Sequence, residues 1–284
     1  MENTVVKIEN LVKNYAELRA LDHLNLEIKQ GEVFGLLGPN GAGKTTTISM
    51  ISTVLLPTEG QVLIDGTPLT RTASTEKRKL SVITQEYSMR QDMTIDEVME
   101  YQGRLYYMKR KEIKRKSDEL LEFAGLAQFR KRTVRHLSGG MKRKVMICRA
   151  LMIEPEILLL DEPTAGMDAF ARRQMWDLLR QINRNRNLTI LLTTHYIEEA
   201  QALCDRVALL DSGKLDIVDT PTNLINDLGA FSVDELLEET VRTTYYSDRA
   251  SAIAYLETVS GDATLRATTL EDVFLERIGK RLVR

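Results

Sequence analysis

The sequence lacks a strong net charge, a disulfide-forming set of cysteines and any long apolar run. With 39 basic and 41 acidic residues, the formal charge is −2, so no overall field attracts nucleic acid or anionic lipid. The two cysteines, Cys148 and Cys204, lie far apart in apolar surroundings, which favours a reduced, cytoplasmic compartment. No run approaches the roughly 18 apolar residues that span a bilayer, and residues 1–9 show no signal pattern. If the protein works at a membrane, we expect another chain to cross it.

A glycine-rich segment provides the strongest functional signal. Gly38-Pro39-Asn40-Gly41-Ala42-Gly43-Lys44-Thr45 fits the pattern G-x-x-x-x-G-K-[S/T], in which backbone N–H groups surround phosphates and the lysine reaches the outer ones. An apolar segment, Glu32–Leu37, precedes it as a strand should, and Thr45–Leu55 can form the helix that must follow. Such a match arises by chance in roughly one chain in a hundred of this length. A nucleotide-binding loop is therefore favoured over a flexible surface turn.

Apolar periodicity predicts two kinds of strand. Leu24–Lys29 and Val62–Ile64 alternate apolar and polar residues, which is typical of half-buried antiparallel strands. Continuous apolar runs indicate strands covered on both faces, and there are four: Val33–Leu37, Ile157–Leu160, Thr189–Leu192 and Val207–Leu210. We therefore predict an α/β fold with a mostly parallel sheet and a small antiparallel β layer.

Two segments fall outside this sheet pattern. Residues from about 88 to 154 are rich in helix formers and predict a helical insertion, whose basic run Lys109–Lys116 we interpret as a solvated helix face. The sheet pattern stops after Lys214, and Thr220-Pro221 marks a boundary. We predict a first domain over residues 1–220 and a small α+β extension over residues 221–284.

The extension is predicted to contain one strand and two helices. The strand covers Val241–Tyr246, and the first helix covers Ser247–Val259. In the last helix Thr268 and Glu271 form a capping box, an apolar face includes Leu270, Val273, Phe274 and Ile278, and Gly279 ends the helix.

A buried strand that ends in two carboxylates is the second functional signal. Ile157–Leu160 leads into Asp161 and Glu162, which in a parallel sheet would emerge beside the phosphate loop. Asp161 suits Mg²⁺, directly or through water, and Glu162 can take a proton from an attacking water. The competing interpretation is that both acids only begin the turn at Pro163.

A third signal is a serine and two glycines that open a helix. Leu137-Ser138-Gly139-Gly140-Met141 precedes a helical stripe of Met141, Val145, Cys148 and Met152, so amides at its start can bind a second anion. Alone, such a segment is more often an ordinary helix cap.

In order and spacing these segments resemble the ATP-binding cassette (ABC) family of P-loop NTPases over nearly the first 220 residues. Gly38–Thr45 resembles its Walker A motif, Leu137–Met141 its signature and Ile157–Glu162 its Walker B. Four single residues also match the family. Tyr15 resembles the aromatic residue that stacks on adenine, Gln85 resembles the Q-loop glutamine, and His195 resembles the switch histidine. Asp168, in Ala165-Gly166-Met167-Asp168, resembles the D-loop aspartate that helps pair two subunits.

The resemblance implies a set of functional residues. The implied catalytic residues are Lys44, Gln85, Glu162 and His195. Those implied to bind ATP are Tyr15, Gly38, Pro39, Asn40, Gly41, Ala42, Gly43, Lys44, Thr45, Thr46, Ser138, Gly139, Gly140 and Asp168. Those implied to hold Mg²⁺ are Thr45, Gln85 and Asp161. One departure is Met141, where many members have glutamine, and it would affect closure of the dimer more than the reaction.

The resemblance also implies partners. Two cassettes, identical or different, would clasp two ATP molecules head to tail, and a separate transmembrane permease would dock on the helical insertion and hold the protein at the inner face of the membrane. No nucleic-acid partner is expected.

Two further segments place the chain near one subgroup. Thr194–Ala200 and Leu270–Gly279 are similar to the ATPases of daunorubicin-resistance-like, ABC-2 exporters, which also carry a short C-terminal extension. We favour a helix that stabilises the dimer over a ligand sensor for that extension. The alternatives for the whole chain are an importer ATPase, a cytosolic ABC ATPase without a transport role, and a nucleotide-binding module that does not hydrolyse.

Overall fold

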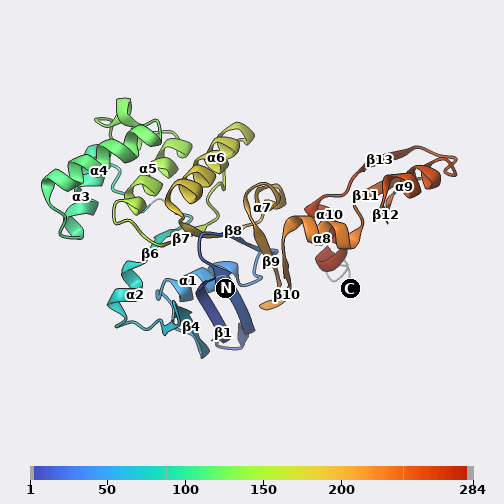
Figure 1. Ribbon diagram of the computed structural model, residues 1–284, viewed down its shortest axis with the longest axis horizontal. Helices are drawn as coiled ribbons and strands as arrows, with labels where there is room; N and C mark the ends of the chain where they lie inside the picture. Colours follow the sequence, from blue (N-terminus) through green and yellow to red (C-terminus); the bar gives the residue numbers. More distant parts are fainter. Residues whose placement is uncertain (1–2, 87, 239, 280–284) are drawn as a thin grey trace.

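A six-stranded, mostly parallel sheet runs through the middle of the molecule (Figure 1). The computed structural model describes residues 3–86, 88–238 and 240–279. The strand order is β10-β9-β3-β8-β7-β6, and neighbours are parallel except β9 and β10. The bounds are β3 Val33–Leu37, β6 Leu80–Ile83, β7 Ile157–Asp161, β8 Thr189–Thr194, β9 Arg206–Asp211 and β10 Lys214–Asp219.

An antiparallel sheet and one helix cover one face of the parallel sheet. The sheet has the order β2-β1-β4-β5. Alternate residues of β3 point to opposite faces: Phe34 and Leu36 join the apolar cluster on this side, whereas Val33 and Leu37 join the cluster on the other. The bounds are β1 Thr4–Tyr15, β2 Leu18–Lys29, β4 Glu59–Ile64, β5 Thr67–Pro68 and helix α1 Lys44–Ile51.

Helices cover the opposite face, and three of them group at one end of the molecule. Figure 1 shows α3, α4 and α5 together, remote from the end of the chain. The N-terminus of α3 is fixed by a capping box between Thr94 and Glu97. The helices on this side are α3 Ile95–Leu105, α4 Arg110–Phe123, α5 Gly139–Leu151, α6 Ala169–Arg186 and α7 Ile197–Leu203, with 3₁₀ turns at Ala127–Phe129 and Val134–His136. The short helix α2 Ser74–Arg78 lies instead on the side of α1 and β4 (Figure 1).

The last 60 or so residues divide between the main core and a small sheet of their own. Leu224, Leu270 and Val273 are buried in the same cluster as Ala200 and Leu203 of α7. The small sheet has the order β12-β11-β13 and, with α9, projects from the end opposite α3 and α4 (Figure 1). The elements are α8 Pro221–Leu228, β11 Phe231–Leu237, β12 Thr240–Tyr246, α9 Arg249–Leu256, β13 Ala263–Ala267, α10 Leu270–Phe274 and a π-helical turn Leu275–Gly279.

The predicted α/β architecture is confirmed, and four details of it are wrong. Within its described residues, the segment after residue 220 contains three strands, β11, β12 and β13, and three helices, α8, α9 and α10, rather than the one strand and two helices predicted. The parallel sheet continues past Lys214, because β10 forms a hairpin with β9. The helix predicted at Ser247–Val259 begins only at Arg249, since Asp248 is its N-cap, and it ends at Leu256. The capping box of the last helix joins Thr269 to Asp272 rather than Thr268 to Glu271. The division at residue 220 stays a prediction.

Candidate nucleotide site

The phosphate loop connects the end of β3 to the start of α1. Gly41 and Gly43 have φ values of 83° and 101°, in the left-handed region that residues with side chains rarely adopt. A Cβ atom at Gly38 would lie 2.3 Å from the backbone oxygen of Leu210. The glycines of the motif are therefore required by the path of the backbone.

Lys44 is held inside this loop. It opens α1, is 6% exposed, and its Nζ donates to the backbone oxygens of Gly38 at 2.8 Å and Pro39 at 3.0 Å. Burial lowers the pKa of Lys44, and the nearby carboxylates of Glu162 and Asp161 oppose this only in part. A buried ammonium bonded to neutral carbonyls favours a phosphate partner that carries negative charge.

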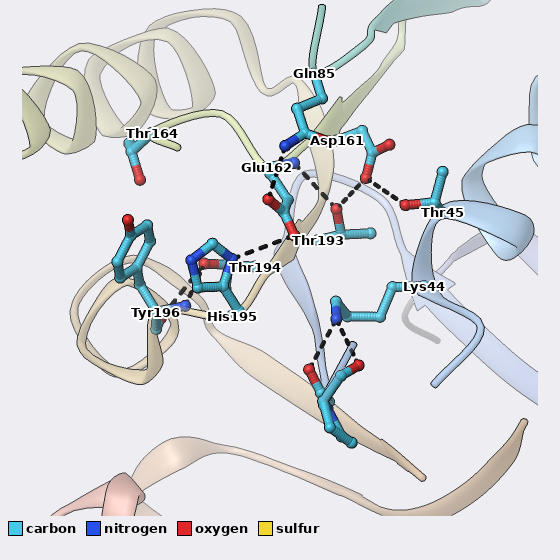
Figure 2. Close-up of polar contacts among 12 residues, drawn as sticks. Lys44, Thr45, Gln85, Asp161, Glu162, Thr164, Thr193, Thr194, His195 and Tyr196 are labelled. Atoms are coloured by element: carbon cyan, nitrogen blue, oxygen red, sulfur yellow. Dashed lines mark hydrogen bonds and ion pairs between the residues drawn. The ribbon is translucent and has the colours of Figure 1, made fainter. Parts of the chain in front are cut away.

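Asp161, the last residue of β7, lies beside the loop. Its Oδ1 accepts hydrogen bonds from Thr45 Oγ1 at 3.2 Å and from Thr193 Oγ1 at 2.6 Å (Figure 2). The strand order explains this contact: β8 lies between β3 and β7, and parallel strands end at the same edge. An oxygen pair of hydroxyl and carboxylate at a phosphate loop is the kind of donor set that Mg²⁺ takes.

Glu162 points toward two other predicted residues. Gln85 Nε2 donates to its Oε2 at 3.3 Å, and His195 Nδ1 lies 3.2 Å from its Oε1 (Figure 2). Its backbone has a φ of 47°, which is uncommon for a residue with a side chain and points to a functional constraint. Three predicted residues from the ends of β6, β7 and β8 therefore meet at one point.

One cavity of about 710 Å³ collects most of the predicted site. The predicted residues that line it are Tyr15, Gly38, Pro39, Asn40, Gly41, Ala42, Gly43, Lys44, Thr45, Thr46, Gln85, Glu162 and His195. Sequence reasoning missed Leu18, Ala20 and Phe274, which also line it. Leu18 and Ala20 lie on β2, shortly after Tyr15 at the end of β1. Phe274 comes from α10, where the sequence analysis assigned it only to an apolar helix face.

The predicted second anion site lies outside this cavity. Ser138, Gly139, Gly140 and Asp168 are not among its lining residues. Ser138 is the N-cap of α5, where its Oγ accepts from the Met141 N–H at 3.3 Å and its side chain is exposed. Asp168 caps α6 in the same way, through the Ala171 N–H at 2.8 Å. The exposed Ser138 at the start of α5 is therefore separate from the cavity that holds the phosphate loop.

The phosphate loop, the carboxylates at the ends of the parallel strands and the cavity define a P-loop nucleotide hydrolase. The chain belongs to the ABC transporter family, whose model matches residues 21–165. It is an ABC ATPase, the ATP-binding subunit of a transporter. Within the described residues, none of the helices is both long and apolar enough to cross a bilayer.

Related proteins carry resistance and export names. The linearmycin resistance ATP-binding protein LnrL of Bacillus subtilis is 36% identical over 82% of this chain and 74% of its own length. The daunorubicin resistance ATP-binding protein DrrA3 of Streptomyces coeruleorubidus is 33% identical over 98% of this chain and 97% of its own length. The Nod factor export ATP-binding protein I of Cupriavidus metallidurans is 35% identical, covering 98% of each.

Solved structures of ATP-binding cassettes share the fold. The cbiO1 subunit of an ABC transporter complex from Clostridium perfringens superimposes with a TM-score of 0.74 at 28% identity, covering 78% of this chain and 91% of that one. A dimeric, post-hydrolysis ATP-binding cassette bound to ADP and Pi gives a TM-score of 0.68 at 30% identity, and the match covers 76% of this chain and 98% of that one.

Proposed function

We propose that this ATPase works as a head-to-tail dimer around two ATP molecules and drives export through a separate permease. The observation that carries the proposal is the separation of its two anion sites. The phosphate loop and Glu162 share one cavity, whereas the exposed Ser138 end of α5 does not line it. One chain can use both surfaces together only if Ser138 contacts nucleotide in a second cassette.

Within the cavity each predicted residue has a role that suits its chemistry. Lys44 binds the β and γ phosphates, Tyr15 stacks on adenine, and His195 contacts the γ phosphate. Glu162 accepts a proton from the attacking water, and Gln85, whose amide faces it at 3.3 Å, orients that water.

We also propose Mg²⁺ as a cofactor, held by Thr45, Gln85 and Asp161. The fit is favourable because Thr45 Oγ1 and Asp161 Oδ1 lie 3.2 Å apart beside the phosphate loop. The described residues contain no cluster of three His, Cys, Asp or Glu that could hold a metal, so phosphate oxygens and water would complete the coordination. Bound there, the ion would neutralise charge that develops on the phosphates.

Several finer features belong to the same proposal. Residues 1–220 form the nucleotide-binding domain, with its helical subdomain over about 88–154, and residues 221–284 form an extension. A membrane permease docks on the helical subdomain and keeps the protein at the cytoplasmic face. The names of the resistance and Nod factor relatives support export. Import and a cytosolic role without a permease are the alternatives.

The central test replaces the proposed base. Glu162→Gln should still bind ATP but hydrolyse it about 100-fold or more slowly, because the amide cannot accept the proton of water. With hydrolysis blocked, the variant should accumulate as an ATP-bound dimer in light scattering, whereas wild type should not. Glu198→Gln is the matched control, since Glu198 is exposed, close in sequence to His195 and outside the cavity.

Two results would contradict the proposal. Wild-type turnover by Glu162→Gln would remove Glu162 from the role of base. A Glu162→Gln chain that stays monomeric with ATP, Mg²⁺ and its permease would remove the dimer. Co-purification from detergent-solubilised membranes tests for the permease, because capture of a polytopic membrane protein supports export or import. A neighbouring reading frame that encodes a solute-binding protein would favour import.

A further inference from the structure

The Arg143 side chain lies between the start of α5 and the catalytic residues. It is 3% exposed, and its guanidinium donates to four backbone oxygens. Nε donates to Pro163 at 2.8 Å, Nη1 to Thr84 at 2.7 Å, and Nη2 to Glu162 at 2.7 Å and Asp161 at 3.5 Å. Only the planar, five-donor fork of arginine can satisfy this many acceptors at once.

These carbonyls belong to the two segments that carry the proposed catalytic side chains. Thr84 directly precedes Gln85 at the end of β6, and Glu162 and Pro163 follow β7. Arg143 therefore fixes the distance between the backbones from which the Gln85 amide and the Glu162 carboxylate emerge.

The backbone of Glu162 is held from both sides. Its N–H donates to the backbone oxygen and to the Oγ1 of Thr193, each at 3.1 Å. Its own carbonyl accepts from Arg143. Since its φ of 47° is an unfavourable conformation, this residue keeps it only while both contacts restrain it. Losing the Arg143 contact would let the backbone relax and turn the carboxylate away from the water.

The same helix carries the second anion site. Ser138 caps α5 five residues before Arg143, which is about 7.5 Å along the helix axis. Movement of the Ser138 end when it meets nucleotide in a second cassette would therefore move the guanidinium that holds Glu162 and Gln85.

We propose that Arg143 is a positioning residue for hydrolysis, and that it links the catalytic residues of one cavity to the α5 end that binds nucleotide in the other cassette. The link rests on the dimer proposed above. The positioning role does not, because it follows from contacts within one chain.

The first test separates catalysis from binding. Arg143→Lys should lower kcat about 10- to 100-fold, because a lysine cannot hold two segments in place. The ATP dissociation constant should change less than about twofold, since these contacts do not touch the phosphate loop. Arg143→Gln serves as a second variant, because an uncharged amide avoids burying an unsatisfied ammonium. Arg130→Lys is the control: its guanidinium joins Asp96 and Asp118 at 2.8 Å, away from the cavity.

The second test measures the link by a double-mutant cycle. If Ser138 acts on its own chain through Arg143, the loss of kcat in Ser138→Ala/Arg143→Lys should be at least about threefold smaller than the product of the single losses. Independent sites would give losses that multiply.

Each outcome decides a separate statement. If Arg143→Lys and Arg143→Gln keep kcat within about twofold, or lose it only as Arg130→Lys does, the positioning role is wrong. If kcat falls but the cycle is multiplicative, the link is wrong. If Glu162→Gln fails to dimerise while Arg143→Lys still lowers kcat, the proposed dimer fails and the positioning role stands.

Discussion

At the scale of single residues, Glu199 shows how a carboxylate outside the cavity can connect the segments around it. It is fully buried on α7, and its Oε1 accepts from Thr164 Oγ1 at 2.8 Å and Trp176 Nε1 at 2.9 Å. Thr164 follows the Glu162-Pro163 turn, and α7 begins just after His195. Glu199 therefore joins the two backbone segments that carry Glu162 and His195. Burial raises the pKa of Glu199, and its hydrogen bonds oppose this only in part.

The sign of that shift predicts how stability depends on pH. The folded protein holds the Glu199 proton more tightly than the unfolded chain, whose pKa is near 4.5. The contribution of Glu199 to the free energy of unfolding is thus most favourable below pH 4.5, and it is lost as the pH rises through the folded-state pKa. Glutamine cannot ionise, so Glu199→Gln should gain stability over wild type from acid to neutral pH, by about 1.4 kcal/mol per unit of pKa shift. Urea unfolding midpoints between pH 4 and 8 measure the difference.

Two controls accompany this measurement. Glu198→Gln, an exposed neighbour, should show no comparable trend. Glu199→Ala should be less stable at every pH, because Thr164 and Trp176 lose their acceptor at about 1–3 kcal/mol for each buried donor. A pH-independent difference between Glu199→Gln and wild type would contradict the argument.

At the scale of elements, the sequence predicted strands most reliably where both faces of the strand are covered. Val33–Leu37 and Thr189–Leu192 are uninterrupted apolar runs because each side packs against a layer. The first strand, Thr4–Tyr15, was missed because its register shifts at several points, so its apolar residues do not keep a period of two. The phosphate loop and the strand-end acids were predictable because their chemistry is local. The contacts of Arg143 and Phe274 depend on segments far apart in the sequence, which no local pattern contains.

The start of α10 shows how a distant residue decides between two equal local signals. Thr268 with Glu271 and Thr269 with Asp272 both fit a capping box. In the structure Asp272 Oδ2 accepts from the N–H and Oγ1 of Thr269 at 2.8 and 2.9 Å, and both Asp272 oxygens accept from Arg266. Burial alone would raise the pKa of Asp272, but these hydrogen bonds outweigh it and lower the pKa. Arg266, from β13, thus selects the register.

Replacing the two acids separates these registers. Asp272→Ala should destabilise α10 by about 1–2 kcal/mol, because it removes the cap and one partner of Arg266. Since Leu270 and Val273 hold α10 against α7, the loss should appear as a lower melting temperature and faster proteolysis after residue 267. Glu271→Ala, the matched control at an exposed position, should change either readout little. Equal effects of the two substitutions would mean that the cap contributes nothing.

At the scale of the whole molecule, apolar burial is distributed unevenly. The parallel sheet lies between two large clusters, one shared with the antiparallel sheet and α1, the other with the helices and with α8 and α10. In contrast, among the described residues of β11, β12, β13 and α9, only Val233 and Ala252 are buried apolar side chains. Each buried side chain of Val size contributes about 1.5–3 kcal/mol, and alanine less. The small sheet therefore has a much weaker core of its own.

This gradient predicts local opening of the small sheet without unfolding of the rest. Backbone amides of β11–β13 should exchange with solvent at least about 100-fold faster than those of β3, β7 and β8, because opening the small sheet exposes few apolar groups. Amides of α8 should exchange more slowly than those of β12, since α8 packs on the main core through Leu224. Adding ATP and Mg²⁺ should slow exchange at the phosphate loop and leave β11–β13 unchanged. Hydrogen exchange followed by mass spectrometry measures all three, and uniform protection across both sheets would show that the extension unfolds only together with the nucleotide-binding core.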